Sequence, residues 1–394
     1  MRVFITCHSS RWGGGISVAQ NLLSAFTRIA PENEYLVTIP RGLGYEACCQ
    51  GLPRCQLFTY VHGELISRWW WETMLLPKVV RDWKPDVVFN MANRGMALPP
   101  CPQATLIQDS HLLYPFGQFG RISLKQRLVF FYHRRHLRRS LKRTQVVFCQ
   151  TKVARDRLWR MYGRAINAEL CPNHVSVFTS QPSECSAVPI SLAAYQNRFI
   201  LFVLTRYYPH KNLEIIPEVF RRFSRELHNV LALLTISPDE SRQAKKMLER
   251  VRTWKLEDKI VTIGPLRQDQ LSAFYLHTDC LFLPTLLESF SGTYIEAMRY
   301  GRPIITSNMD FARVVCGAAA EYFNPLDPES IFAAILRVRD DRSRRDQLVA
   351  AGKKQQAAGP GSWDEIARAV MGRLTALAGA NEGVKAKIDV GTQW

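Results

Sequence analysis

The sequence contains no long hydrophobic run. Charged residues interrupt every apolar stretch well short of the roughly 20 residues that a membrane-spanning helix needs. The stretch from Met1 to Cys7 is too short for the apolar region of a signal peptide and is better used as a first strand. We therefore expect a cytoplasmic protein without a membrane-spanning helix.

Paired-cysteine motifs are also missing. The ten cysteines include no C-x-x-C pair, and no histidine-rich metal spacing accompanies them, which argues for a reducing compartment and against a zinc site. Cys48, Cys49 and Cys55 are close in sequence but lack a fourth ligand of convincing spacing. Three further cysteines are interpreted as small hydrophobic residues of strands: Cys7, Cys149 and Cys280.

Acidic residues are scarce, with 34 Asp and Glu against 52 Lys and Arg and a formal net charge of +18. Nine of the basic residues lie between Arg121 and Arg143, a segment without a single acid. Apolar residues interleave with them, which predicts a basic amphipathic helix at an anionic membrane surface. Nucleic-acid binding, which we do not expect, and a merely solvated helix are the alternatives. The cations expected at the membrane are Arg134, Arg135, Arg138 and Arg139.

Strand-like apolar runs alternate with helical stretches along the chain, a pattern typical of parallel sheets flanked by helices. The predicted strands span 85–89, 104–107, 145–149, 199–204, 230–236, 260–263, 279–283 and 303–306. The 394 residues can build two cores. We predict an α/β fold with two Rossmann-like domains, residues 1–180 and 192–360, whose parallel sheets face across a cleft. A linker over 181–191 joins them, and residues 361–394 form a helix crossing back to the first domain, and a tail.

Two glutamates eight positions apart carry the strongest functional signal. Glu288 follows the predicted strand at 279–283, and Glu296 lies on a helix for which Ser291 and Gly292 offer capping chemistry. The free N–H groups at the start of such a helix favour a phosphate. Carboxylates beside it can accept hydrogen bonds from sugar hydroxyls. The alternative is that both glutamates are ordinary surface charges.

Two cations lie after the predicted strand at 199–204. In open α/β sheets ligands bind outside the carboxyl ends of strands. At this position the guanidinium of Arg206 can make two parallel hydrogen bonds to a diphosphate, and the ammonium of Lys211 adds a point charge. Either cation alone would suit an ordinary surface turn.

At the amino terminus, the glycines from Gly13 to Gly15 form a flexible loop between a strand and a helix predicted from Ile16 to Ile29. This loop is neither a G-x-G-x-x-G fingerprint nor a P-loop.

Together these segments resemble retaining glycosyltransferases of the GT-B fold, family 4 (glycosyl transferases group 1). The resemblance includes the E-x7-E element from Glu288 to Glu296 and the following Gly301-x-Pro303. It implies a donor site for a nucleotide sugar at Gly14, Gly15, Arg206, Lys211, Asn212, Leu266, Glu288, Ser291, Gly292, Thr293 and Glu296. Arg206 and Lys211 would hold the pyrophosphate, Glu296 the ribose, and Glu288 the transferred sugar.

Residues 108–111 are expected, together with Gly13, to contact the acceptor. Asp109 and His111 follow the predicted strand at 104–107, although a lone histidine after a strand is more often structural. The family often has His-Asp where this chain has Gln108 before Asp109. The segment from Arg313 to Gly317 also departs from the family, whose members usually carry an acid just before the Val-x-Gly, so the subgroup stays open.

The resemblance implies a hexosyltransferase that moves a sugar from a nucleotide diphosphate to a hydroxyl with retained configuration. Its catalytic residues would be Arg206, Lys211, Glu288 and Asp109, with no metal and no cofactor. The acceptor is expected to be a glycan or a lipid-linked acceptor of bacterial surface polysaccharide, lipopolysaccharide or glycolipid synthesis, reached at the inner face of the cytoplasmic membrane. Alternatives are a nucleotide-sugar epimerase or a phosphorylase of the same fold, a glycoside hydrolase, or a basic nucleic-acid-binding protein.

Overall fold

The computed structural model describes residues 1–11, 13–50, 54–60, 70–91, 93–118, 122–176, 189–195 and 197–391. The chain divides into two compact units, described separately below. The first comprises Met1–Leu113, Leu124–His174 and Pro360–Trp394, and the second comprises Tyr114–Ser123 and Val175–Gly359. Most of the predicted linker, residues 181–188, lies outside the described residues.

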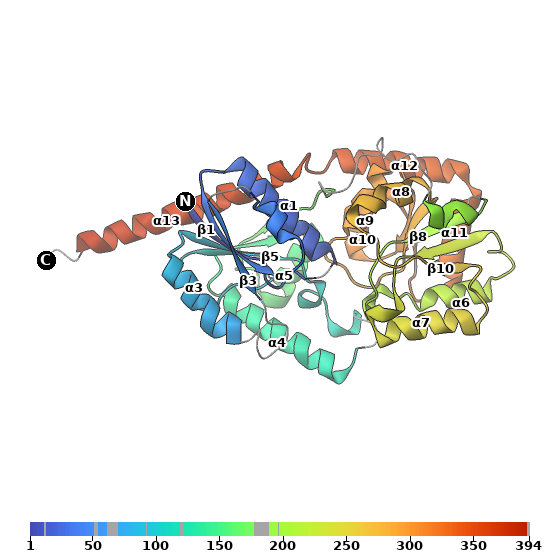
Figure 1. The fold of residues 1–394 in the computed structure, drawn as a ribbon, viewed down its shortest axis with the longest axis horizontal. Helices are drawn as coiled ribbons and strands as arrows, with labels where there is room; N and C mark the ends of the chain where they lie inside the picture. Colours follow the sequence, from blue (N-terminus) through green and yellow to red (C-terminus); the bar gives the residue numbers. More distant parts are fainter. Residues whose placement is uncertain are drawn as a thin grey trace. The chain divides into compact units, whose positions relative to one another are not determined.

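A seven-stranded parallel sheet forms the centre of the first unit, in the order β3-β2-β1-β4-β5-β6-β7 (Figure 1). The strands are β1 (Arg2–Thr6), β2 (Glu34–Pro40), β3 (Cys55–Tyr60), β4 (Val87–Asn90), β5 (Gln103–Ile107), β6 (Val146–Cys149) and β7 (Ala168–Leu170). The described helices include α1 (Gly13–Ile29), α3 (Leu76–Trp83), α4 (Leu124–Leu141), α5 (Lys152–Tyr162) and α13 (Trp363–Gly391). The central strands are near-continuous apolar runs because both faces of the sheet are covered.

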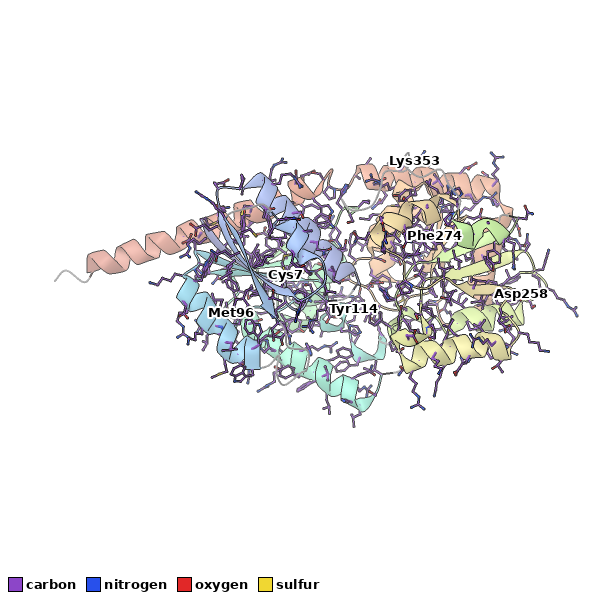
Figure 2. The ribbon with its side chains drawn as sticks, viewed as in Figure 1. Cys7, Met96, Tyr114, Asp258, Phe274 and Lys353 are labelled. Carbon is purple, nitrogen blue, oxygen red and sulfur yellow. The ribbon has the colours of Figure 1, made fainter. Side chains whose placement is uncertain are left out.

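The end of the chain belongs to the core of the first unit. Trp363, Ile366 and Leu374 of α13 are buried in one cluster with residues of β1 and α1. An ion pair between Arg28 and Asp364 joins α1 to α13. The same cluster contains Cys7, which follows β1 and is fully buried, as the sequence predicted (Figure 2).

The second unit is built on a six-stranded parallel sheet in the order β10-β9-β8-β11-β12-β13. Its strands are β8 (Phe199–Val203), β9 (Val230–Leu234), β10 (Ile260–Thr262), β11 (Cys280–Leu283), β12 (Ile304–Ser307) and β13 (Ala320–Phe323). Its helices include α6 (Ile215–Arg222), α7 (Arg242–Thr253), α8 (Leu271–Leu276), α9 (Gly292–Arg299), α10 (Asp310–Cys316), α11 (Pro328–Asp340) and α12 (Arg342–Ala357).

Strand order positions the functional loops in both units. In the second unit the chain proceeds outward on one side from β8 to β10 and on the other from β11 to β13, so the order reverses between the neighbours β8 and β11. The corresponding reversal in the first unit lies between β1 and β4. Ligands of open α/β sheets bind outside the carboxyl ends of strands at such a reversal. No helix in the described ranges is long and apolar enough to cross a bilayer.

Candidate functional site

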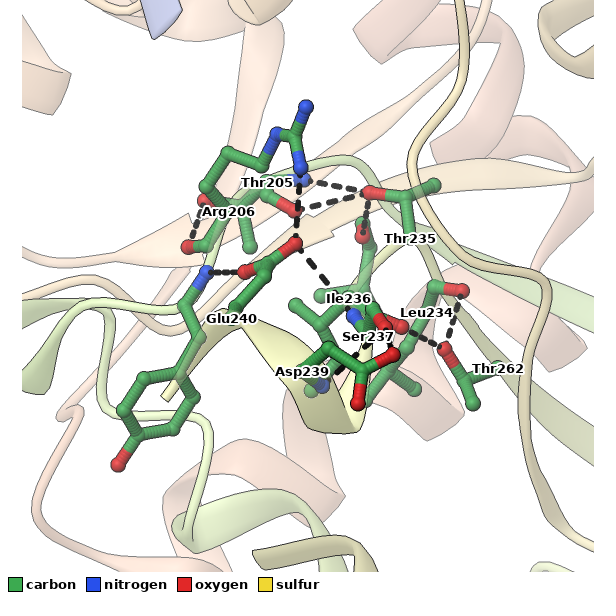
Figure 3. Close-up of polar contacts among 11 residues, drawn as sticks. Thr205, Arg206, Leu234, Thr235, Ile236, Ser237, Asp239, Glu240 and Thr262 are labelled. Carbon is green, nitrogen blue, oxygen red and sulfur yellow. Dashed lines mark hydrogen bonds and ion pairs between the residues drawn. The ribbon is translucent and has the colours of Figure 1, made fainter. Parts of the chain in front are cut away.

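The loop after β8 is held in place by a glutamate from a neighbouring strand's loop. Glu240 accepts hydrogen bonds from Arg206 Nη1 at 3.1 Å and from the backbone N of Tyr207 at 2.7 Å (Figure 3). The Arg206 side chain is still 50% exposed, so part of the guanidinium faces solvent. Glu240 stands in no recognisable motif and lies on a short 3₁₀ helix after β9.

Thr235 links the ends of β8 and β9 by hydrogen bonds. Its Oγ1 accepts from the backbone N of Thr205 at 3.0 Å and donates to the carbonyl of Thr205 at 2.9 Å (Figure 3). Because the hydroxyl satisfies both backbone groups, the residue before Arg206 is fixed at the edge of the sheet.

Lys211 and Glu288 form an ion pair across the loops that follow β8 and β11. Each side chain is only 15% exposed. Lys211 was expected to hold phosphate and Glu288 sugar, and the structure brings these two side chains into contact with each other. A carboxylate so close offsets part of the positive charge of Lys211.

Asn212 stabilises the same loops by hydrogen bonds. It adopts the left-handed conformation with φ of 55°, which asparagine tolerates better than most residues. Its Nδ2 donates to the carbonyls of Pro284 at 3.2 Å and Pro325 at 2.7 Å. The side-chain amide therefore joins the loops after β8, β11 and β13, a structural role that the sequence did not predict.

Helix α9 begins directly after the Glu288 loop. Ser291 is the residue before the helix, but its hydroxyl does not cap the helix, which corrects the capping expected from the sequence. It instead pairs with the hydroxyl of Thr293 at 2.8 Å. Helix N–H groups without an internal acceptor are suited to bind an anion, and Gly292 keeps this helix start free of a side chain.

Glu296 points toward a buried tyrosine. Burial raises the pKa of Glu296, and the hydrogen bond from Tyr275 Oη to its Oε2, at 3.0 Å, opposes that rise only partly. Tyr275 is itself fully buried on α8, and sequence analysis did not single it out. A carboxylate with a raised pKa and one fixed donor is ready to accept further hydrogen bonds from hydroxyls.

Leu266, expected in the donor site, lies half-buried in the loop after β10. Beside it Arg267 forms an exposed ion pair with Asp269. No described contact links this loop to Glu296, so its role stays a prediction.

In the first unit, helix α1 begins at Gly13, which corrects the expectation of a loop through Gly15. Gly13 has φ of +48°, in the left-handed region that favours glycine. A Cβ built on Gly13, Gly14 or Gly15 would meet no atom within 4 Å. The space beside this first turn is therefore open.

Asp109 and His111 follow β5 as predicted and contact each other. Asp109 Oδ1 accepts from the backbone N and lies 2.9 Å from Nδ1 of His111. Burial acts to raise the pKa of Asp109, but the hydrogen bonds from His111 outweigh it and lower that pKa to about 2. The imidazole also stacks on Phe130 at 4.4 Å. Asp109 thus orients His111 and is ionised at neutral pH.

The basic helix α4 differs from its prediction at two points. Arg134 is not a free surface cation, because its Nε and Nη2 donate to the carbonyl of His111 at 3.0 and 2.8 Å and burial lowers its pKa. Arg135, Arg138 and Arg139 are exposed as predicted. An exposed apolar stripe that sequence analysis missed runs beside them: Leu124 at 73%, Leu128 at 63% and Phe131 at 60% exposure.

A second charged cluster of the first unit was also missed. Arg94 Nη2 lies 3.3 Å from the Glu72 carboxylate, and Arg94 Nη1 lies 2.9 Å from His133 Nδ1. His8 contacts Glu72 at 3.4 Å. No pattern in the sequence links residues this far apart. Among the described residues, no group of three His, Cys, Asp or Glu is placed to hold a metal ion.

Residues 188–355 match the family model described as Glycosyl transferases group 1. The chain is 25% identical over 170 residues to the serotype-specific mannosyltransferase WbdA of Escherichia coli, a match that covers 43% of this chain and 21% of that protein. The chain thus spans about a fifth of the length of this relative.

Solved structures match over nearly the whole chain. Anabaena Alr3699/HepE, in complex with UDP and glucose, is 14% identical, with a TM-score of 0.69 and coverage of 95% of this chain and 100% of that one. WaaG, a glycosyltransferase involved in lipopolysaccharide biosynthesis, is 12% identical with a TM-score of 0.69 and the same coverages. These likenesses confirm the predicted GT-B fold.

Proposed function

Because residues 188–355 belong to the glycosyl transferases group 1 family, we propose that the protein is a retaining glycosyltransferase that uses a nucleotide-diphosphate sugar. The observation that carries this proposal is the grouping, within one unit, of Arg206, Lys211, Glu288 and the start of α9 at the ends of β8 and β11. Two cations and a helix N-terminus suit a diphosphate, and carboxylates suit sugar hydroxyls.

The leaving diphosphate gathers negative charge as the glycosidic bond breaks. Arg206, Lys211 and the N–H groups of α9 stabilise that charge by preorganised positive potential, without need of a metal. When the donor binds, its phosphate becomes a second anion for Lys211, and Glu288 turns its oxygens to the hydroxyls of the transferred sugar. Glu296 accepts hydrogen bonds from the ribose. The acceptor hydroxyl attacks the anomeric carbon from the side on which the phosphate leaves, and the leaving phosphate takes the proton of that hydroxyl. Because attack and departure occur on the same face, the anomeric configuration is retained.

The acceptor side is assigned to the first unit. Asp109 keeps His111 oriented, and we assign this pair to contact with the acceptor. The open space beside Gly13, Gly14 and Gly15 admits ligand atoms close to the backbone. We assign Asp109 to positioning through His111.

Helix α4 is proposed to dock on an anionic membrane surface. Exposed Arg135, Arg138 and Arg139 attract anionic headgroups, and the stripe of Leu124, Leu128 and Phe131 enters the interface. A lipid-linked acceptor at the inner face of the cytoplasmic membrane follows from this surface. The similarity to the mannosyltransferase WbdA and to WaaG, a glycosyltransferase involved in lipopolysaccharide biosynthesis, supports a hexosyl donor and a surface-polysaccharide product.

The deciding experiment measures donor binding and then turnover. We expect one nucleotide among UDP-, GDP-, ADP- and dTDP-sugars to raise the unfolding temperature by mass action, and EDTA to leave that rise unchanged. Lys211→Ala should lower transfer about a hundredfold, on the order of 3 kcal/mol. Arg222→Ala, which removes an exposed cation of the same unit, is the matched control.

The rival activities give different products. Turnover of the donor without any acceptor would identify an epimerase, and dependence on free phosphate would identify a phosphorylase. Hydrolysis of a plain glycoside without a nucleotide would favour a hydrolase. Full activity of Lys211→Ala would refute the phosphate clamp.

A further inference from the structure

The loop that follows β5 is held in place by side chains from other segments of the first unit. Asn93, in the loop after β4, accepts through its Oδ1 from the backbone N atoms of Gln108 and Asp109, at 2.5 and 2.8 Å. Asp109 in turn accepts from the backbone N of His111 at 2.9 Å. Side chains therefore fix the backbone where the short 3₁₀ helix Ser110–Leu112 begins.

The carbonyl groups of that 3₁₀ helix are held from α4 and α5. Arg134 of α4 donates from Nε and Nη2 to the carbonyl of His111, at 3.0 and 2.8 Å. Tyr162, the last residue of α5, donates from Oη to the carbonyl of Leu112 at 2.8 Å. Ordering an arginine side chain costs rotamer entropy, which hydration of the same carbonyl would not. The loop is therefore held more rigidly than satisfaction of its backbone groups requires.

The imidazole of His111 is fixed at its edge and on its face. Its Nδ1 lies 2.9 Å from Asp109 Oδ1, and its ring stacks on Phe130 with centroids 4.4 Å apart and planes 14° apart. The side chain of His111 is still 18% exposed. A ring that is held from two directions thus presents part of its surface to solvent, as a group that binds a ligand must. Such groups need packing and hydrogen bonds around them to hold their geometry.

Both contacts from α4 come from one side of that helix. Phe130 and Arg134 are four residues apart on α4, so one side chain lies a turn above the other. Both are half-buried, whereas the exposed apolar stripe of α4 faces solvent. The residues that hold His111 are therefore distinct from those proposed to meet a membrane, and either set can be changed without removing the other.

We propose that Phe130 and Arg134 are positioning residues that act on the acceptor through His111, with Arg134 fixing its backbone and Phe130 its ring. This inference rests on the proposed function, which assigns Asp109 and His111 to the acceptor. Displacement of a binding group by about 1 Å can lower a rate about a hundredfold. Loss of either support should therefore slow transfer, although neither side chain is assigned to contact the acceptor.

The first measurement follows the imidazole of His111 by nuclear magnetic resonance. Full-length protein is labelled with ¹³C in its histidine rings, and the signal is assigned by its loss in His111→Gln. Phe130→Leu should move the ring-proton signals of His111 downfield, because a stacked aromatic ring shields the protons above it. Phe130→Tyr retains a stacked ring and should leave these signals close to those of the parent.

The arginine is tested in the same way. Arg134→Gln removes two hydrogen bonds to the carbonyl of His111 and should shift or broaden the His111 signals, because the end of the loop is released. Arg160→Gln replaces an exposed arginine of α5 in the same unit and should leave them unchanged.

The second measurement is transfer from the nucleotide sugar that stabilises the parent protein, with octyl mannoside and octyl glucoside as acceptor probes. We expect Phe130→Leu and Arg134→Gln to lower kcat/KM for the acceptor about tenfold. The KM for the donor should not change, because the proposed phosphate and sugar contacts belong to the second unit. Phe130→Tyr should restore most of the lost transfer, which a variant that merely damages the fold would not predict.

The outcomes separate this inference from the function on which it rests. Unchanged His111 signals in both Phe130→Leu and Arg134→Gln would overturn the proposal. Shifted signals with unchanged kcat/KM for the acceptor would also overturn it, and would remove His111 from the acceptor side. Failure of the proposed function would be seen in the parent protein itself, as absence of donor stabilisation and of transfer. It would remove the acceptor role of His111 even if the signals shift as expected.

Discussion

At the scale of single residues, Lys211 and Glu288 of the proposed donor site form an ion pair with each other. Lys211 and Glu288 are largely buried, so removing one leaves the other with an uncompensated charge. We predict that Lys211→Met lowers the free energy of unfolding by about 2 kcal/mol, less than for a fully buried pair because both side chains keep some exposure. The double variant with Glu288→Gln should lose less than the sum of the single variants.

Denaturant unfolding of the four proteins of this double-mutant cycle measures the coupling. Strict additivity would show that the two side chains do not interact in solution. Arg222→Met with Glu329→Gln, which removes an exposed ion pair of the same unit, supplies a comparison cycle with a coupling of about 0–1 kcal/mol.

Glu296 gives a prediction whose sign follows from its raised pKa. Burial makes the folded state bind a proton more tightly than the unfolded state, so the ionised carboxylate destabilises the fold above its folded pKa. We expect Glu296→Gln to be more stable than the parent at pH 7. The difference should shrink as the pH falls through the raised pKa toward the ordinary glutamate value of about 4.3. Thermal unfolding against pH measures it, and a variant less stable at pH 7 contradicts it.

The same variant should be less active. Replacing a carboxylate by an amide removes a charged acceptor for ribose hydroxyls, and hydrogen bonds to charged groups are worth about 1.5–3 kcal/mol. We therefore expect kcat/KM for the donor to fall about tenfold to a hundredfold. An unchanged donor KM and kcat would remove Glu296 from the donor site.

At this scale the sequence predicted the residues that stand in motifs and missed those that support them. Arg206, Lys211, Glu288 and Glu296 follow apolar runs, so their place at strand ends was predictable. Glu240 and Tyr275 belong to segments without a motif. They reach the site because β9 and α8 pack beside β8 and β11, and this proximity depends on strand order.

At the scale of elements, a substitution in the first turn of α1 should change the stability and the activity of the protein in opposite directions. Gly14 has no positive φ and its Cβ would meet no atom, so Gly14→Ala should stabilise the fold by about 0.5–1 kcal/mol. Donor or acceptor turnover should fall, because the methyl group occupies space assigned to ligand. Gly13→Ala is the matched contrast, since φ of +48° makes alanine destabilising there by about 1 kcal/mol. Unchanged activity of Gly14→Ala would show that no ligand approaches this turn.

Helix α4 is the element that we expect to bind an anionic membrane surface. We expect Leu128→Glu with Phe131→Glu to reduce binding to vesicles containing phosphatidylglycerol at least tenfold, because burial of apolar area and attraction to anionic lipid both decline. Raising the salt concentration should weaken binding of the parent. Leu326→Glu replaces an exposed leucine of the second unit and should bind like the parent. Equal vesicle binding by all three proteins would leave α4 a solvated helix.

The elements also show where sequence patterns stop being informative. Buried central strands such as β4, β5, β8 and β11 are continuous apolar runs and were predicted within a few residues. The interior strand β2 and the edge strands β3, β7 and β13 were not predicted, whereas the edge strand β10 was. β3 and β7 are partly exposed, and Glu321 interrupts the apolar residues of β13, so these three strands are not the continuous apolar runs that distinguish a buried strand from a loop. Apolar residues between the cations of α4 were predicted, but which of them share the exposed face was not.

For the whole molecule, alternating strands and helices predicted parallel sheets, while the assignment of segments to units depended on long-range packing. Residues 361–394 were predicted to cross back to the first domain, and Trp363 belongs to the first unit although it is more than 300 residues from β1 in sequence. It lies there because α13 completes the apolar core against α1. Chain order alone would group it with the second unit, whose strands it follows.

This packing predicts that the two units differ in their response to one substitution. Trp363→Ala removes a buried aromatic side chain from the core of the first unit and should cost about 3–5 kcal/mol there. Hydrogen exchange resolved by peptide should accelerate on β1 and β4 by about a hundredfold or more and stay unchanged on β8 and β11. The stabilisation of the second unit by donor nucleotide should persist, because Arg206, Lys211, Glu288 and Glu296 all belong to that unit. Equal acceleration of exchange in both sheets would instead mean that the chain unfolds as one cooperative body.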